Sequence, residues 1–188
     1  MGFPTPKMNI HNGQLEVWTV GHSTRPIDEL IETLKSFKIA LLVDVRSYPG
    51  SRRYPQFNKA NLADSLEAAG ITYVHKPQLG GRRRARKDST NIAWRNESFR
   101  GYADYMETES FREAIEDLLE LAREDRTAVM CAEAVWWRCH RALISDYLKA
   151  RGITVTHILA ADKSQPHPYT SAARIVNGEL SYKALLAS

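Results

Sequence analysis

The segment AVMCAEAVWWRCHRALISDYLKARG, residues 128–152, shows how the chain is organised. Residues 128–130 form a short apolar run, which predicts a buried strand that ends at Cys131. After a polar loop, apolar residues recur at helical spacing between positions 143 and 148. A strand, a polar loop and a helix in this order are typical of a parallel α/β sheet.

The rest of the chain repeats this alternation. Strands are predicted at 15–20, 40–45, 71–74 and 153–159, with helices starting near residues 27, 61 and 108. Asn177-Gly178 lies between two short apolar runs and predicts a β-hairpin near the C-terminal end. We therefore expect an α/β fold: one three-layer domain over residues 15–188 with a mostly parallel, Rossmann-like sheet. A flexible arm is expected at residues 1–14 and a basic irregular insertion at about 76–107.

Composition narrows the class of protein. The chain has 188 residues, with 26 basic and 22 acidic side chains and a formal charge of +4, so it has only a mild preference for anions. It contains no apolar run of the roughly 18 residues that a membrane span needs. Its first residues lack the apolar centre of a signal peptide. We expect a cytoplasmic protein with no membrane partner, whose two cysteines are free thiols.

Polar side chains follow four of the predicted strands where each strand ends. They are His22 and Ser23, Asp44 and Arg46, His75, and Cys131 with Glu133. In open α/β sheets, ligands bind outside the carboxyl ends of the strands. The sequence thus predicts one site at this edge of the sheet.

Cys131 has two interpretations. As a thiol at a strand end, near Arg138, His140 and Arg141 in sequence, it is a candidate nucleophile. Alternatively, it completes an apolar core strand, since cysteine is among the most buried residue types. Cys139-His140-Arg141 predicts an anion-binding or acid/base site at a helix N-terminus, against the alternative of a capped surface turn.

The other strand-end residues complete a candidate catalytic set. His140 or His22 is the candidate acid/base, Asp44 its orienting partner, and Glu133 a further candidate carboxylate. The candidates for binding an anionic substrate are Ser23, Arg46, Arg52, Arg138, Cys139 and Arg141. For His22 taken alone, a buried histidine satisfied by hydrogen bonds is the more frequent outcome.

A metal site would use the same atoms. Cys131, Cys139, His140, His22, Asp44 and Glu133 are all possible ligands, and a metal-dependent enzyme is therefore an alternative. The sequence has neither C-x-x-C nor H-x-x-x-H spacing. No metal site is predicted on this basis, and the cofactor is unknown.

The insertion carries a basic run, Arg82-Arg83-Arg84-Ala85-Arg86-Lys87, followed by Trp94. Arginines interleaved with aromatic residues are what phosphate pairing and base stacking require. The alternative is a solvated charged loop. A nucleic-acid-binding module without chemistry is therefore a second hypothesis, in which Arg82, Arg83, Arg84 and Trp94 contact the nucleic acid.

Several motifs in order, GHST, DVRSYPGSRRYPQFN, LGGRRR, WRNESFRGYADYM, CAEAVWWRCHR and HPYTSAARIVNGELSY, resemble the DUF488 family. The resemblance spans about residues 17–182 and implies one compact α/β domain without implying an activity. The order of Asp44-Val45-Arg46, Cys131 and the following helix also resembles, more weakly, the layout of rhodanese sulfurtransferases and cysteine phosphatases. We therefore expect an enzyme that acts on an anionic substrate, a nucleotide or nucleic acid, in the strand-end crevice.

Overall fold

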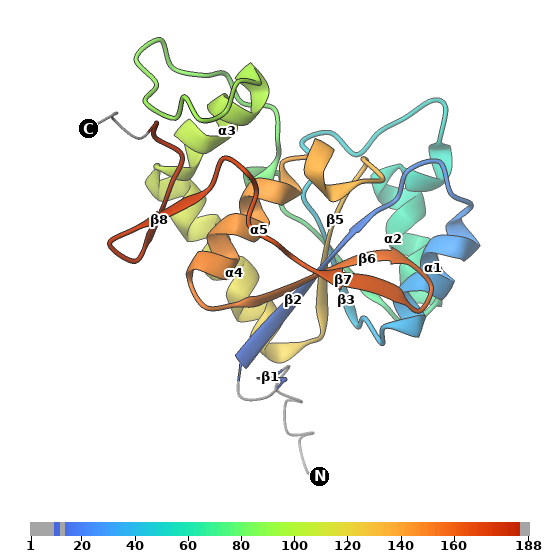
Figure 1. The fold of residues 1–188 in the computed structure, drawn as a ribbon. Coiled ribbons are helices and arrows are strands. Elements are labelled where there is room, and N and C mark those ends of the chain that lie inside the picture. The colour runs from blue at the N-terminus through green and yellow to red at the C-terminus, as the bar shows by residue number, and fades with distance from the viewer. Residues whose placement is uncertain (1–9, 12–13, 185–188) are drawn as a thin grey trace.

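The computed structural model describes residues 10–11 and 14–184, and the rest of the predicted arm and residues 185–188 lie outside that range. Five strands form the parallel part of the sheet (Figure 1): β2 (Gln14–Gly21), β3 (Leu41–Asp44), β4 (Thr72–His75), β5 (Thr127–Cys131) and β6 (Thr154–Ala160). The strand order is β4-β3-β5-β2-β6-β7, so the polar ends of β3, β5 and β2 are neighbours. The predicted α/β class with a mostly parallel sheet is confirmed.

Helices cover both faces of the sheet (Figure 1). Helices α1 (Ile27–Ser36) and α2 (Lys59–Ala68) pack on one face, and α3 (Glu97–Met106), α4 (Glu109–Glu124) and α5 (Arg141–Ala150) pack on the other. Because side chains alternate along a strand, the two faces bury two separate apolar cores. Among the described residues, the helices are too short or too polar to cross a membrane.

Local sequence explains where several elements begin and end. Thr108 caps α4 by accepting a hydrogen bond from the Phe111 N–H at 3.3 Å. Gly70 and Gly152 both have φ +78°, the left-handed conformation that ends a helix and leads into the next strand. The hairpin predicted around Asn177-Gly178 is formed by β8 (Arg174–Val176) and β9 (Glu179–Ser181).

Three elements depart from the sequence expectation. The insertion at 76–107 is irregular only in part, because it includes the short helix η2 (Pro77–Leu79) and all of α3, whose N-cap Asn96 accepts from Ser98 and Phe99 N–H. A polar edge strand, β7 (Lys163–Pro166), runs antiparallel to β6. Within the expected arm, β1 (Ile10–His11) pairs with β2. Polar edge strands lack the apolar alternation that makes strands recognisable in sequence.

Leu118 tests the core on the α4 face, because its side chain is fully buried there. Leu118→Ala should reduce the free energy of unfolding by about 2–5 kcal/mol, since it removes buried methyl groups and leaves a cavity. Glu120→Ala, an exposed position on the same helix, should change it by less than about 0.5 kcal/mol. Urea unfolding measures both, and equal effects would contradict the placement of α4.

Candidate functional site

The carboxyl ends of β2, β3 and β5 place the predicted residues at one edge of the sheet. Backbone hydrogen bonds fix this arrangement: the His22 N–H donates to the Cys131 carbonyl and the Val45 N–H to the Met130 carbonyl, both at 3.0 Å. The side chains then divide between the two faces, because Cys131 packs into the core beside α4 and α5 whereas Met130 packs beside α1 and α2. The residues predicted to form a single site therefore form two adjoining groups of side chains, one on each face of the sheet.

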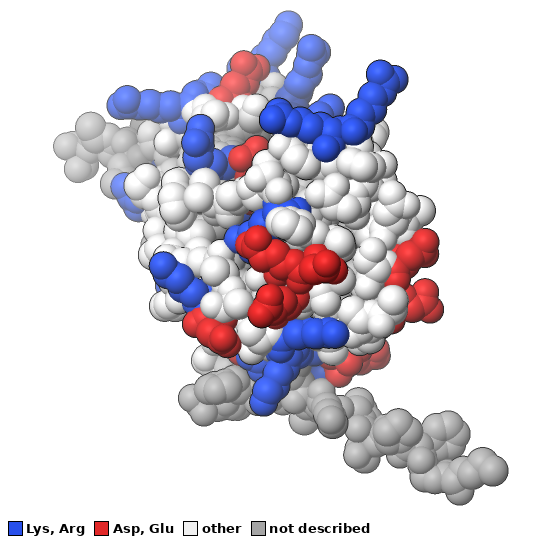
Figure 2. All heavy atoms as spheres, turned by 90° about the vertical axis from the view of Figure 1, so that its right-hand side faces the viewer, with Lys and Arg blue, Asp and Glu red and all other residues white. Residues whose placement is uncertain are grey.

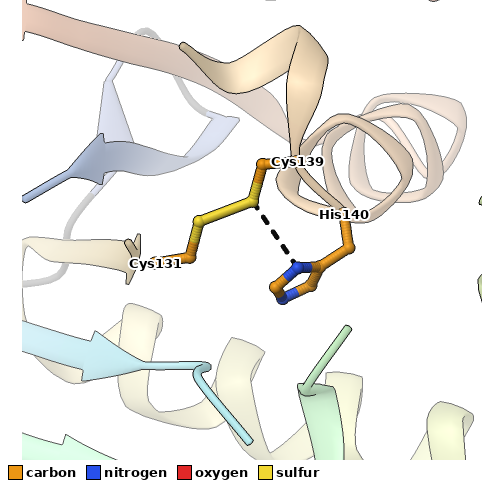
Figure 3. Close-up of side chains that lie close together, drawn as sticks. All are labelled: Cys131, Cys139 and His140. Atoms are coloured by element: carbon orange, nitrogen blue, oxygen red, sulfur yellow. Dashed lines mark hydrogen bonds between the residues drawn. A yellow bond between two sulfur atoms is a disulfide. The ribbon is translucent and has the colours of Figure 1, made fainter. Parts of the chain in front are cut away.

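The first group consists of Cys131, Cys139 and His140 (Figure 3). Cys131 ends β5, the short helix η3 (Trp136–Arg138) crosses above it, and Cys139 and His140 lead into α5. The structure joins the two cysteines in a disulfide, so the expectation of two free thiols is corrected. Sequence reasoning missed the pairing because it depends on how the loop folds back. Cys139 Sγ lies 3.5 Å from His140 Nδ1.

His140 is held in a closed environment. Its ring contacts Tyr102, and Gly81 approaches so closely that an added Cβ would lie 2.3 Å from His140 Nδ1. Burial, together with the positive charge of Arg141, lowers the pKa of His140 to about 4. Nε2 is buried and forms no regular hydrogen bond in the described structure, and the Val45 backbone is close enough to the ring to oppose part of this lowering of the pKa. At neutral pH, His140 is therefore a neutral imidazole with one nitrogen beside sulfur.

Arg141 is a buried cation between the two groups, with a side chain only 1% exposed. Its guanidinium donates to the backbone carbonyl of Glu133 and, at 3.4 Å, to Thr19 Oγ1. Within the described residues no carboxylate lies at ion-pair distance, and Arg141 Nε has no partner. Burial lowers the pKa of Arg141 to about 10, so it keeps its charge at neutral pH. The Glu133 carboxylate stabilises this charge from beyond ion-pair distance, and a buried cation that lacks a direct ion pair favours a nearby anion.

The second group is centred on Asp44 and Arg46. The Asp44 carboxylate is fully buried and binds the Arg46 guanidinium through two hydrogen bonds of 2.6 and 2.9 Å. Tyr73 donates to the same carboxylate at 2.7 Å, and burial together with the charge of Asp44 raises the pKa of Tyr73. Arg46 is thus already neutralised, which makes it a weaker anion clamp than the sequence suggested.

His22 belongs to this second group. Its ring stacks on Phe57 at 4.1 Å, Nδ1 donates to the Ser23 carbonyl at 2.8 Å, and Nε2 accepts from Arg46 at 3.2 Å. Burial and the charge of Arg46 lower the pKa of His22 to about 4. Asp44 makes no hydrogen bond to His22, and its charge opposes part of this lowering of the pKa. With both nitrogens in use, His22 is suited to positioning the strand ends.

The other predicted residues are at the rim or in the insertion. Glu133, Arg52 and Arg138 are exposed, and Ser23 is half-buried with φ +53°. In the insertion, Arg83 stacks on Tyr105 and donates to backbone carbonyls, whereas Arg82 and Arg84 are exposed. Trp94 packs against Phe99 and Tyr182. Trp94 is therefore partly buried, and these contacts hold its ring against the core beside the hairpin.

Sequence reasoning missed a chain of buried histidines that begins at Arg141. Thr19, which receives the Arg141 hydrogen bond, lies 2.6 Å from His157 Nδ1, and His157 Nε2 lies 2.8 Å from His167 Nδ1. His167 Nε2 then lies 3.0 Å from Asp146. Thr19 is far from His157 and His167 in the sequence, so the sequence could not show that they are hydrogen-bonded. The only signal available was the apolar sequence around each residue, which predicts burial.

Asp146 anchors this chain. Its buried carboxylate accepts hydrogen bonds from His167, from Tyr182 at 2.8 Å, and from both the N–H and the hydroxyl of Thr170. A carboxylate that only accepts requires His167 to donate through Nε2, so His167 Nδ1 accepts from His157 and His157 Nδ1 accepts from Thr19. In this chain, each hydrogen bond is donated in the direction of Asp146. The bonds that Asp146 accepts from Thr170 and Tyr182 connect the C-terminal segment to the site.

A groove of about 660 Å³ lies elsewhere, between the hairpin and helices α3 to α5. Its lining includes Arg112, Tyr147 and Glu179 but none of the two groups described above. The strand-end site is instead covered by the loop between Cys131 and Cys139, and both cysteines are less than 5% exposed. A substrate can reach the sulfur atoms only if this loop moves.

A family model described as a domain of unknown function, DUF488, matches residues 26–148. The chain belongs to the DUF488 family. The match includes Asp44, Cys131, Cys139 and Arg141, and it leaves out the whole of β2 and β6, together with His22 and His157. Comparisons with curated proteins and with solved structures gave no match. DUF488 membership therefore supports the resemblance seen in the sequence and assigns no activity.

Asp146 provides a test of the buried histidine chain. Asp146→Asn should reduce the free energy of unfolding by about 2–4 kcal/mol, because the amide NH₂ would face donors that now share a carboxylate. Asp64→Asn, at an exposed position on α2, should change it by less than about 0.5 kcal/mol. The measurement is urea unfolding with the cysteines kept in one oxidation state. A variant as stable as the unaltered protein would refute the network.

Proposed function

We propose that this protein is an enzyme that acts on an anionic substrate, a nucleotide or nucleic acid, at the carboxyl ends of β2, β3 and β5. The observation that carries the proposal is the buried Arg141 guanidinium, which forms no direct ion pair among the described residues and adjoins a cluster of two sulfurs and a neutral imidazole. A buried charge without a direct ion pair is costly unless an anion binds beside it. Unusually perturbed titratable groups also cluster at functional sites more often than elsewhere.

The geometry suggests separate roles for the predicted residues. Cys131 and Cys139 supply the reactive sulfur, and His140 supplies a neutral imidazole. Arg141 stabilises negative charge on the substrate or on the thiolate. His22, Arg46 and Asp44 position the strand ends around this centre.

The rim residues complete the proposal. Glu133 and Arg138 are exposed in the loop that covers the cysteines, and Arg52 is exposed in the loop that follows β3, where a substrate would first make contact. Arg52 and Arg138 would attract its phosphates, and Ser23 would contact it at the end of β2. Glu133 would oppose an anion bound close to it, so its carboxylate suits proton transfer better than binding.

The enzyme hypothesis is tested by turnover of a defined panel. The full-length chain, reduced with a dithiol, is incubated with ribonucleoside mono-, di- and triphosphates and with short single-stranded RNA and DNA, and products are identified by mass spectrometry. At least one compound should be converted, and Cys131→Ser should lower its rate by at least about 100-fold. Ser145→Ala, which removes a buried hydroxyl without a hydrogen-bond partner, is the matched control and should retain the rate. Turnover that Cys131→Ser leaves unchanged would refute the assignment.

The second candidate function is nucleic-acid binding without chemistry. It is favoured by the basic side chains that gather along the top of the molecule in Figure 2. The top is the same in Figure 1, where β2 runs toward it. In the insertion, Arg82, Arg84 and Lys87 are exposed, whereas Arg86 is neutralised by Glu107 at 2.6 Å. Free cations at this edge would contact phosphates, and the cysteines would then be structural.

Salt dependence distinguishes this candidate. Binding of single- or double-stranded oligonucleotides should weaken steeply with salt, because phosphate contacts release counterions. Arg84→Gln should reduce the slope of log K against log salt by about 1, and Arg123→Gln, exposed at the end of α4, should not change it. Fluorescence anisotropy over a salt series measures this. Absent or salt-insensitive binding would exclude the binding module.

A further inference from the structure

We propose that Cys131, Cys139 and His140, when the cysteines are reduced, bind one thiophilic divalent metal ion such as Zn²⁺. The three side chains each offer a ligand atom, and these atoms all lie within 4.8 Å of one another. They come from the end of β5 and the start of α5, and they point toward one another (Figure 3). This inference rests on the proposed function in that it assigns a cofactor to the same site.

The spacing of sulfur and nitrogen fits a shared metal ion. Zinc binds thiolate at about 2.3 Å and imidazole at about 2.0–2.1 Å, so at the tetrahedral angle the sulfur and nitrogen lie about 3.6 Å apart. Cys139 Sγ and His140 Nδ1 are 3.5 Å apart. The spacing of this hydrogen-bonded pair therefore matches the spacing that two ligands of one zinc ion require.

The backbone separation of the two cysteines is also informative. Their Cα atoms are 7.8 Å apart, whereas disulfide-bonded cysteines usually have Cα atoms roughly 4.4–6.8 Å apart. Two thiolates on one tetrahedral ion have sulfurs about 3.8 Å apart, which suits a wider backbone separation. The backbone therefore separates the two cysteines by a distance that would accommodate an ion between their sulfurs once the disulfide is reduced.

Charge favours the same conclusion. Two thiolates and one divalent ion sum to zero, so the occupied site adds no net charge to a region that already contains the buried Arg141 cation. A neutral group is far less costly to bury than two isolated thiolates. Three protein ligands would leave one tetrahedral position for water or substrate, which is the pattern of catalytic and not structural zinc sites.

The disulfide and the metal site are two states of the same atoms. A dithiol reductant breaks the Cys131–Cys139 bond by thiol–disulfide exchange: it transfers two electrons and two protons to the cysteines and becomes a disulfide itself. Metal binding then releases the two thiol protons. With Nδ1 bound to the ion, the ring proton of His140 would reside on Nε2, which is buried near the Val45 backbone.

The test measures metal binding without any substrate. Full-length protein is reduced, freed of metal and titrated with Co²⁺, whose tetrahedral thiolate complexes absorb in the visible and near ultraviolet, and then with Zn²⁺ in competition. One equivalent should bind per chain. Cys131→Ser, Cys139→Ser and His140→Ala should each weaken binding by more than about 100-fold, beyond the effect of losing a neighbouring hydrogen-bond partner. His75→Gln, a histidine outside the cluster, should bind as the unaltered protein does.

Two further measurements show whether a loss of metal binding in a variant reflects loss of a ligand or loss of the fold. Zn²⁺ should raise the thermal unfolding temperature of the unaltered reduced protein, and Cys139→His, which retains a ligand, should recover part of the binding lost in Cys139→Ser. Less than stoichiometric binding by the reduced protein, or equal affinity in His140→Ala, would overturn the metal site. Turnover of the nucleotide panel by metal-free protein would overturn it as a catalytic cofactor while leaving the enzyme proposal intact.

Discussion

The parallel pairing of β5 between β3 and β2 is the constraint on which the rest of the site depends. Each backbone N–H and C=O in a buried strand must find a partner, and these pairings fix Gly21 opposite Cys131 and Asp44 opposite Met130. Because side chains alternate along a strand, the same register sends Cys131 toward α5 and His22 and Asp44 toward α1 and α2. A shift of one residue would exchange the faces and separate the two cysteines.

Arg141 links the two faces of the site to the remainder of the fold. Its guanidinium holds the loop through the Glu133 carbonyl and reaches Thr19 on β2, from which the hydrogen-bonded histidines lead to Asp146. Close packing at Gly21 reinforces this, because an added Cβ would lie 2.8 Å from Arg141 and still closer to the loop backbone. The loop that covers the cysteines is therefore supported from beneath by a buried polar network. Such networks favour one arrangement when every member is satisfied, and Arg141 Nε is the member that lacks a partner.

The low pKa values of His22 and His140 have a common cause in burial near arginine. Both imidazoles are neutral at neutral pH, yet their nitrogens are used differently. His22 has both nitrogens in hydrogen bonds, whereas His140 has one beside Cys139 and one that forms no regular hydrogen bond. The same residue type thus has a positioning role at the end of β2 and a potential chemical role at the start of α5.

The sequence by itself determined the α/β class, the parallel strands, the hairpin at Asn177-Gly178 and the gathering of polar residues at one edge, because apolar periodicity and turn residues are local signals. It also singled out Cys131, Cys139 and His140. Only the tertiary structure decided that these three meet, that Asp44 neutralises Arg46, and that Trp94 packs against Tyr182. The Thr19–Asp146 connection was not predictable either. Those features depend on contacts between residues far apart in the chain, and no local pattern records which distant partner a buried polar group will find.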